Sequence, residues 1–214
     1  MDLWPLRHLP KIKVKLRDYQ KEAIEHWCKQ KTGSIVLPTG AGKTIVGLKI
    51  IEIVNSPTLI VVPTLDLVKQ WTKILSQSFN IEIGNIGGGT ENIQAITVST
   101  YDSAYIKAQS IGNKFLLIVF DEVHHLPAPS YRLIAETFVA PYRLGLTATI
   151  EREDHLEEDF PYLIGKSTFR ISADELAKNN YLANYAIERK QTYMSKEEYL
   201  KYKENMTIYH TCLK

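Results

Sequence analysis

The sequence has few cysteines, little net charge and no long apolar run. Only two of its 214 residues are cysteine, Cys28 and Cys212, and they are far apart with no metal-ligand spacing. This usage argues against a disulfide framework and favours a reducing compartment, so we expect a cytoplasmic protein. The net charge of +2 is too small to indicate binding of nucleic acid or membrane by itself, so such a function must be argued from local motifs.

Targeting and membrane-spanning patterns are also missing. The first residues lack the basic region and long apolar run of a signal peptide, and no apolar stretch approaches the roughly 20 residues that span a bilayer. We therefore expect no membrane partner. The content of 44% hydrophobic and 23% charged residues is that of an ordinary globular protein, and the length suits one good-sized domain with an appendage.

What the sequence does contain is a phosphate-binding pattern, Leu37-Pro38-Thr39-Gly40-Ala41-Gly42-Lys43-Thr44. It lies between a β-branched apolar run and a helical pattern, which is the strand–loop–helix context that this motif requires. Backbone N–H groups and the helix dipole would hold a phosphate there, with Lys43 on the β- and γ-phosphates and the Thr44 hydroxyl on Mg²⁺. The strict pattern has glycine where this chain has Leu37, at the strand end, where we expect a small cost. A plain glycine turn is the alternative.

Apolar runs alternate with helical patterns along the chain. This order predicts an α/β fold, a doubly wound parallel sheet with helices on both faces and ligands at the carboxyl ends of its strands. We predict Asp18 as the cap of the first helix. The predicted strands are 34–37, 58–62, 81–83, 95–99, 115–120 and 142–146, and the predicted helices are 18–28, 45–54, 65–79, 103–108 and 130–138.

Two acids, Asp121 and Glu122, follow the most hydrophobic predicted strand. At the end of a strand neighbouring the phosphate loop, Asp121 would hold Mg²⁺, and Glu122 would orient and deprotonate the water that attacks the γ-phosphate. An ordinary acidic helix start is the alternative. His124 and His125 lack the geometry of a metal-ligand pair, and we expect His124 to link this site to the next motif.

The Asp121-Glu122-Val123-His124 sequence resembles the DExH box of superfamily 2 helicases, and Thr147-Ala148-Thr149 resembles their third motif. The resemblance implies a RecA-like P-loop NTPase fold, in which these hydroxyls couple hydrolysis to strand movement. Arg17 and Gln20 are similar to the family's Q motif at the adenine. Arg152-Glu153-Asp154 resembles the RED motif of XPB-type DNA helicases, proposed there to help separate strands, although an acidic solvated segment explains it equally well.

The same resemblance implies a DNA strand held by its phosphates, with ATP and Mg²⁺ as cofactors. Trp71 would also match, but a core position is the commoner role of such a residue. Glycine turns and helix caps are the alternatives for several others. The matching positions are Pro63, Thr64, Gln70, Gly87, Gly88, Thr100, Tyr101 and Ser103.

We predict two regions: a RecA-like ATP-binding domain at residues 1–170, and a linker or start of a second domain at 171–214. In XPB relatives the second RecA-like domain supplies arginines to the γ-phosphate, so we expect this chain to bind nucleotide and hydrolyse it slowly. A repair nuclease or transcription-factor subunits are further implied partners, with the DNA in the nucleoid if the source is a prokaryote. The alternatives are a non-catalytic ATP-dependent binding module, and another superfamily 2 translocase such as an RNA helicase or remodeller.

Overall fold

The computed structural model describes residues 8–149, 156–183, 188 and 190–212. The chain divides into two compact units, Met1–Leu182 and Ala183–Lys214, and each is described by itself. Within the described part of the chain, no helix combines the length and the apolar character that crossing a membrane requires.

The first unit contains one eight-stranded sheet with the strand order β4-β3-β5-β2-β6-β7-β1-β8. Every pair is parallel except β3 with β4. The strands are β1 (Thr32–Val36), β2 (Thr58–Val62), β3 (Gly84–Gly87), β4 (Thr90–Asn92), β5 (Ile96–Thr100), β6 (Leu117–Asp121), β7 (Tyr142–Thr147) and β8 (Thr168–Arg170). The predicted α/β architecture is therefore confirmed.

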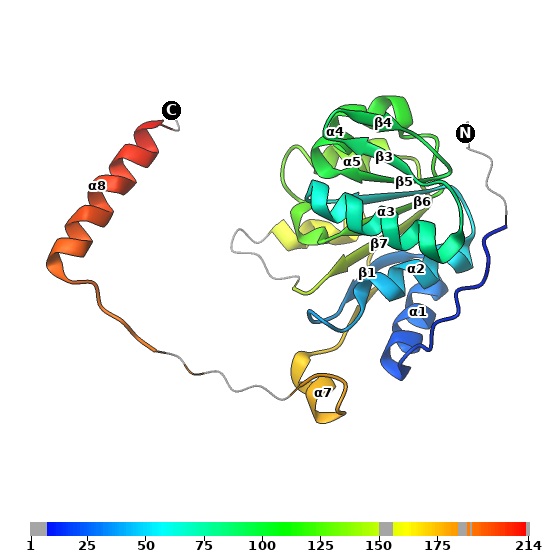
Figure 1. Cartoon of the computed structure of the whole chain (residues 1–214), viewed down its shortest axis with the longest axis horizontal. Helices are drawn as coiled ribbons and strands as arrows, with labels where there is room; N and C mark the ends of the chain where they lie inside the picture. Colours follow the sequence, from blue (N-terminus) through cyan, green and yellow to red (C-terminus); the bar gives the residue numbers. More distant parts are fainter. Residues whose placement is uncertain (1–7, 150–155, 184–187, 189, 213–214) are drawn as a thin grey trace. The chain divides into compact units, whose positions relative to one another are not determined.

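Helices cover both faces of the sheet (Figure 1). They are α1 (Asp18–Gln30), α2 (Lys43–Val54), α3 (Leu65–Phe79), α4 (Tyr101–Ile111), α5 (Arg132–Thr137), α6 (Phe160–Leu163) and α7 (Ala173–Lys178), with short 3₁₀ helices η1 (Val123–His125) and η2 (Leu156–Asp159). The second unit contains α8 (Lys196–Cys212), which begins with a capping box: Glu198 accepts from the Ser195 N–H, and the Ser195 hydroxyl accepts from the Glu198 N–H.

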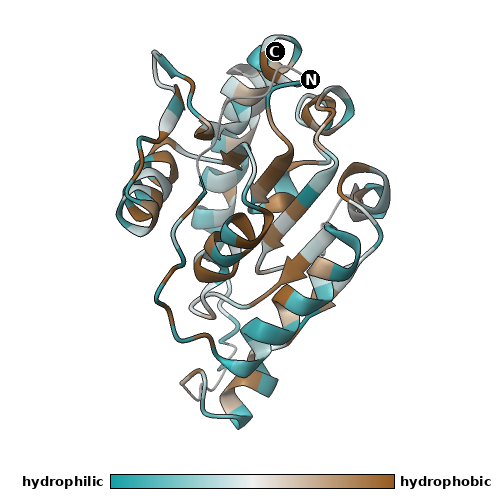
Figure 2. Ribbon diagram, turned by 90° about the vertical axis from the view of Figure 1, so that its right-hand side faces the viewer, coloured by the Kyte–Doolittle hydropathy of each residue, from teal (hydrophilic) through white to brown (hydrophobic). Residues whose placement is uncertain are grey.

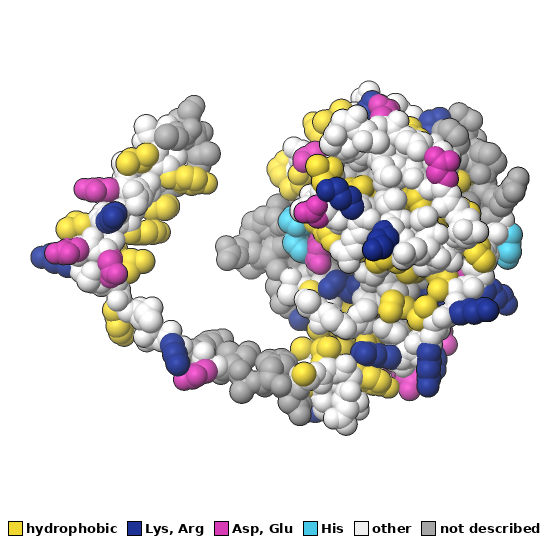
Figure 3. Space-filling model, in the orientation of Figure 1, with side chains coloured by type: hydrophobic (Ala, Val, Ile, Leu, Met, Phe, Trp, Pro, Cys, Tyr) yellow, Lys and Arg dark blue, Asp and Glu magenta, His cyan; other side chains and the backbone are white. Residues whose placement is uncertain are grey.

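The hydrophobic core is divided by the sheet into two clusters. One packs side chains of α1, α2 and α3, among them Trp27 and Leu75, on one face. The other packs α4, α5 and α6 on the opposite face, with Ile134 and Leu163 fully or almost fully buried. The strands between them are hydrophobic along most of their length (Figure 2), as expected where a parallel sheet is covered on both sides. The face visible in Figure 3 carries scattered charges of both signs.

Three local predictions are wrong or shifted. The strand predicted at 81–83 begins instead at Gly84, where pairing with Thr97 of β5 starts. Ile83 precedes the strand and is nevertheless buried. Its hydrophobicity therefore reflects burial and does not predict which residues pair with β5. Asp18 is the first helical residue, and Arg17 takes the cap position, with its N–H donating to the Gln20 side chain at 3.0 Å. The sequence also favours a possible strand at 185–192; half of these residues lie outside the described ones, and 188 and 190–192 are not in a strand.

Candidate active site

The phosphate loop connects β1 to the first turn of α2, as predicted. Gly40 and Gly42 have φ values of 81° and 84°, which side chains with a Cβ rarely adopt. A Cβ at Gly42 would also lie 2.6 Å from the Gln20 side-chain nitrogen. Leu37, which stands where the strict motif has glycine, is fully buried, and its N–H donates to the Thr147 carbonyl at 3.0 Å. It therefore extends the strand and leaves the tight part of the loop unchanged.

Lys43 and Thr44 occupy the first turn of α2, and both are half-buried. The Lys43 ammonium lies 4.0 Å from a carboxylate oxygen of Glu122 and 3.4 Å from the Leu37 carbonyl oxygen. The phosphate loop and the acidic pair are thus brought together. The expectation that they follow neighbouring strands is wrong, because β7 lies between β1 and β6. A long lysine side chain spans that interval.

Asp121 is the last residue of β6 and is only 7% exposed. Its carboxylate accepts from the Trp71 indole N–H at 2.8 Å and from the Glu122 N–H at 3.1 Å. Burial raises the pKa of Asp121 above its ordinary value, and the nearby Glu122 carboxylate adds to this, whereas the bond from Trp71 and the charge of Lys43 oppose it. The site therefore holds a buried acid that a cation would stabilise in its charged form.

Glu122 adopts a left-handed backbone conformation, with φ of 49°. This conformation turns the chain out of β6 and into η1 directly after Asp121. Strained backbone of this kind persists where the surrounding structure enforces it, often at functional sites. The turn places the Glu122 carboxylate between Lys43, at 4.0 Å, and the Nδ1 atom of His124, at 3.5 Å.

His124 links the acidic pair to the third motif, as predicted. Its Nδ1 atom lies 3.1 Å from the hydroxyl of Thr147, at the end of β7. That hydroxyl donates to the Thr149 carbonyl at 2.6 Å and accepts from the Thr149 N–H at 3.2 Å, which folds the Thr147-Ala148-Thr149 turn over its own strand. A chain of contacts therefore runs from Glu122 through His124 to the end of β7.

The start of α1 holds the phosphate loop from the other side. The Gln20 amide donates to the Ala41 carbonyl at 2.9 Å, and the Tyr19 hydroxyl donates to the same oxygen at 2.8 Å. Arg17 is exposed beside them. The predicted Q-motif residues thus lie at the loop. Tyr19 is not among the predicted site residues, since no sequence spacing signals a hydroxyl bonded to a loop carbonyl.

The predicted DNA-contacting loops converge at one edge of the sheet. Thr64 and Thr100 cap α3 and α4, their hydroxyls accepting from the N–H groups of Leu67 and Ser103. Gly87 lies close to the starts of both helices: a Cβ at this position would be 3.1 Å from Leu65 and 3.3 Å from Thr100. Pro63 and Ser103 are half-buried, whereas Gln70 and Gly88 are exposed.

A hollow of about 550 Å³ opens beside this edge, between α3 and the β3–β4 hairpin. Its lining includes Gly87 and Gly88 together with the basic side chains of Lys69 and Lys73. The exposed turn and the lysines give this edge groups that suit a phosphate backbone.

Two aromatic residues near this edge are core residues. Tyr101 is 1% exposed and its hydroxyl donates to the Asp121 carbonyl at 3.1 Å, so its predicted contact with DNA would have to be made by its backbone at the start of α4. Trp71 is also 1% exposed, as the core alternative had it, and supports Asp121. Arg152, Glu153 and Asp154 lie outside the described residues.

Comparisons with known proteins agree with these motifs. A model of the family described as type III restriction enzyme, res subunit, matches residues 13–152. The DNA 3'-5' translocase XPB2 of Sulfurisphaera tokodaii is 51% identical over 194 residues, which cover 91% of this chain and 44% of that protein. The putative DNA 3'-5' helicase Rad25 of Haloarcula marismortui is 38% identical over 160 residues, 72% of this chain and 26% of that protein.

Among solved structures, the UvsW helicase from bacteriophage T4 matches with a TM-score of 0.61 at 19% identity, over 76% of this chain and 63% of that one. This likeness shows the RecA-like helicase fold alone. The chain spans less than half the length of the two curated relatives. The chain belongs to the family of the type III restriction enzyme res subunit, and its similarity to XPB2 and Rad25 confirms the XPB-type superfamily 2 resemblance of its motifs.

Proposed function

We propose that this chain is the ATP-binding motor domain of an XPB-type DNA helicase or translocase. The observation that carries the proposal is the approach of Lys43 to Glu122, at 4.0 Å, across the end of β7. The γ-phosphate of a bound nucleotide would fit beside the P-loop lysine and the DExH glutamate. The lysine would bind this phosphate, and the glutamate would hold a water molecule next to it. The naming of similar proteins as DNA 3'-5' translocase and helicase supports the choice of DNA.

The residues at the site fit a magnesium ion together with phosphates. Mg²⁺ is commonly held by one or two carboxylates, with phosphate oxygens and water as its other ligands. Asp121 supplies the buried acid with a raised pKa, and Thr44 supplies a hydroxyl at the loop. When bound, the ion would neutralise phosphate charge. Glu122 would orient the attacking water and accept its proton, and His124 would pass the state of the site to Thr147.

One DNA strand would lie along the edge formed by the caps of α3 and α4 and the Gly87-Gly88 turn. Helix N-termini and hydroxyls bind phosphates without reading base sequence. The proximity of Gly87 to Leu65 and Thr100 supports a continuous track over these three loops. A second RecA-like domain would supply arginines to the γ-phosphate, so the 214-residue chain should hydrolyse ATP slowly by itself.

The proposal is tested by titrating the chain with a fluorescent ATP analogue in the presence of Mg²⁺, and by measuring phosphate release with and without single-stranded DNA. We expect Lys43→Ala to reduce nucleotide affinity at least tenfold, because it removes the ammonium that faces the phosphates. Lys29→Ala is the matched control, since Lys29 is exposed near the end of α1 and should leave affinity unchanged.

Equal nucleotide affinity of the wild-type chain and the Lys43→Ala variant would contradict the phosphate assignment. Glu122→Gln separates the motor from a non-catalytic binding module. In a motor this variant binds ATP as the wild type does and releases still less phosphate, whereas in a binding module both proteins release phosphate only at the uncatalysed rate.

A further inference from the structure

We propose that Tyr181, in the segment that follows α7, completes the nucleotide site with Arg17 by stacking on the base. This inference rests on the proposed function, because it assumes a nucleoside triphosphate at the phosphate loop. Neither residue lies in the loop, and Tyr181 lies outside every motif identified in the sequence, about 140 residues after the glycines.

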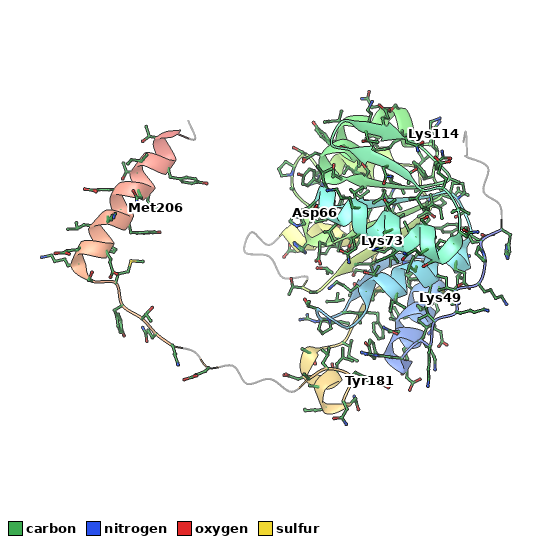
Figure 4. The ribbon with its side chains drawn as sticks, in the orientation of Figure 1. Lys49, Asp66, Lys73, Lys114, Tyr181 and Met206 are labelled. Atoms are coloured by element: carbon green, nitrogen blue, oxygen red, sulfur yellow. The ribbon has the colours of Figure 1, made fainter. Side chains whose placement is uncertain are left out.

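Tyr181 is packed against the start of α1 within the first unit (Figure 4). Its ring lies edge-on to Tyr19, with ring centroids 5.1 Å apart, and the Arg17 guanidinium carbon lies 5.7 Å from its centroid. Arg17 also donates from Nη1 to the Tyr181 carbonyl at 3.0 Å. Three contacts thus fix the ring and the guanidinium next to one another.

The same segment touches the phosphate loop. Tyr19, on which the Tyr181 ring packs, donates its hydroxyl to the Ala41 carbonyl of that loop. Leu182 lies 3.7 Å from the position of a Cβ on Gly40. The Arg17–Tyr181 pair is therefore adjacent to the loop on the side of α1, where Gln20 also bonds to Ala41.

The direction of a bound nucleotide follows from the two ends of the site. The contact between Lys43 and Glu122 marks the γ-phosphate end. A nucleotide with its phosphates along the loop would carry its base away from that pair, toward Arg17 and Tyr181. Arg17 is exposed and Tyr181 is half-buried, so both offer surface to a ligand. A guanidinium and an aromatic ring are the groups on which a base stacks, whatever its hydrogen-bonding edge.

A purely structural role for Tyr181 would be to anchor α7. That role is already filled by Leu176, which is fully buried in the core beneath α7. The capping box between Ser172 and Glu175 further fixes the start of the helix. The Tyr181 side chain packs partly on this core and its hydroxyl lies 3.5 Å from an Asp18 carboxylate oxygen, while the rest of the ring, beside the exposed Arg17, stays accessible to a ligand.

The test compares MgATP with inorganic tripolyphosphate as ligands of the full chain, since only the first carries a base. We expect Tyr181→Ala to weaken MgATP binding about tenfold and to leave tripolyphosphate binding unchanged, because base stacking alone is lost. Tyr181→Phe should keep nearly all affinity, since the ring remains. Tyr162→Ala, at a tyrosine that is 83% exposed on α6, is the matched control and should change neither affinity.

Two outcomes would overturn the inference while leaving the proposed function intact: a Tyr181→Ala variant that binds MgATP as the wild type does, or one that loses both ligands equally, which would indicate a disturbed loop. Failure of the wild-type chain to bind either ligand would instead overturn the proposed function.

Discussion

Asp121 carries a charge that the protein must bury when no cation is bound. Burial raises the pKa of its carboxyl, and Glu122 raises it further, although Trp71 and Lys43 partly compensate. We expect Asp121→Asn to stabilise the nucleotide-free protein, because the buried charge disappears while the amide oxygen still accepts from Trp71; the bond from the Glu122 N–H is lost and limits the gain. A gain of about 1 kcal/mol would raise the melting temperature by roughly 2–4 °C. Calorimetry measures it, with the exposed Asp66→Asn as control.

The pH dependence of this difference follows from the direction of the pKa shift. A carboxyl whose pKa is raised on folding binds more protons in the native state than in the unfolded state. Its contribution to stability therefore falls as pH rises from the pKa of the unfolded state through the higher pKa of the folded state. The wild type and Asp121→Asn should therefore differ least at acidic pH, where Asp121 is protonated, and most near neutral pH. A difference that grows on acidification would contradict this account. With Mg²⁺ and nucleotide bound, the wild type should instead be the more stable protein, because the variant would lack the carboxylate that we propose as a ligand of the cation.

The roles of individual residues were predictable only where a motif assigns them. Lys43, Glu122 and His124 lie together in the structure as the motifs predicted. Trp71 and Tyr19 support the site through an indole N–H and a hydroxyl that sequence periodicity describes only as apolar helix positions. Their contacts depend on how α3 and α1 pack on the sheet, which no local pattern contains.

At the scale of elements, apolar runs predicted the buried strands well and the edges of the sheet poorly. β2 and β6 are buried throughout and mostly hydrophobic, and α3 spans the predicted residues 65–79. β3 contains two glycines and is stabilised by pairing with β5, so its sequence carries little strand propensity. β4 is exposed at each of its residues and was not predicted, because nothing hydrophobic marks a strand that faces solvent.

The first turn of α4 gives an element-scale prediction about DNA. Ser103 lies in that turn, and its N–H donates to the capping hydroxyl of Thr100, so a negative charge there would face the phosphates of a bound strand. We expect Ser103→Glu to weaken binding of labelled single-stranded DNA at least tenfold in fluorescence anisotropy at low salt. An acid near a helix N-terminus favours the helix, so stability should hold.

Ser110→Glu provides the matched control, because Ser110 is exposed near the other end of the same helix. It should bind DNA as the wild type does. Similar losses in both variants would show a general charge effect, and no loss in either would place the DNA elsewhere than on the caps of α3 and α4.

At the scale of the whole molecule, the compact first unit extends to Leu182. The predicted first domain ends at residue 170, and α7 follows it; Leu176 of that helix is buried in the same core as α1 and α2. α8, in the other unit, exposes large hydrophobic side chains, among them Tyr199, Leu200 and Ile208. Stability and nucleotide binding should therefore reside in the first unit, including the residues after 170.

Two shortened chains test this division. A chain ending at Leu182 should keep the melting temperature and the MgATP affinity of the full chain, because it retains the whole first unit. A chain ending at Ile171 loses the burial of Leu176, worth roughly 1.5–3 kcal/mol, and should melt several degrees lower. It should also bind MgATP more weakly, because Tyr181 is lost. Equal melting temperatures for both shortened chains would show that α7 adds nothing to the core, whereas a lower melting temperature already at Leu182 would show that residues 183–214 stabilise the first unit.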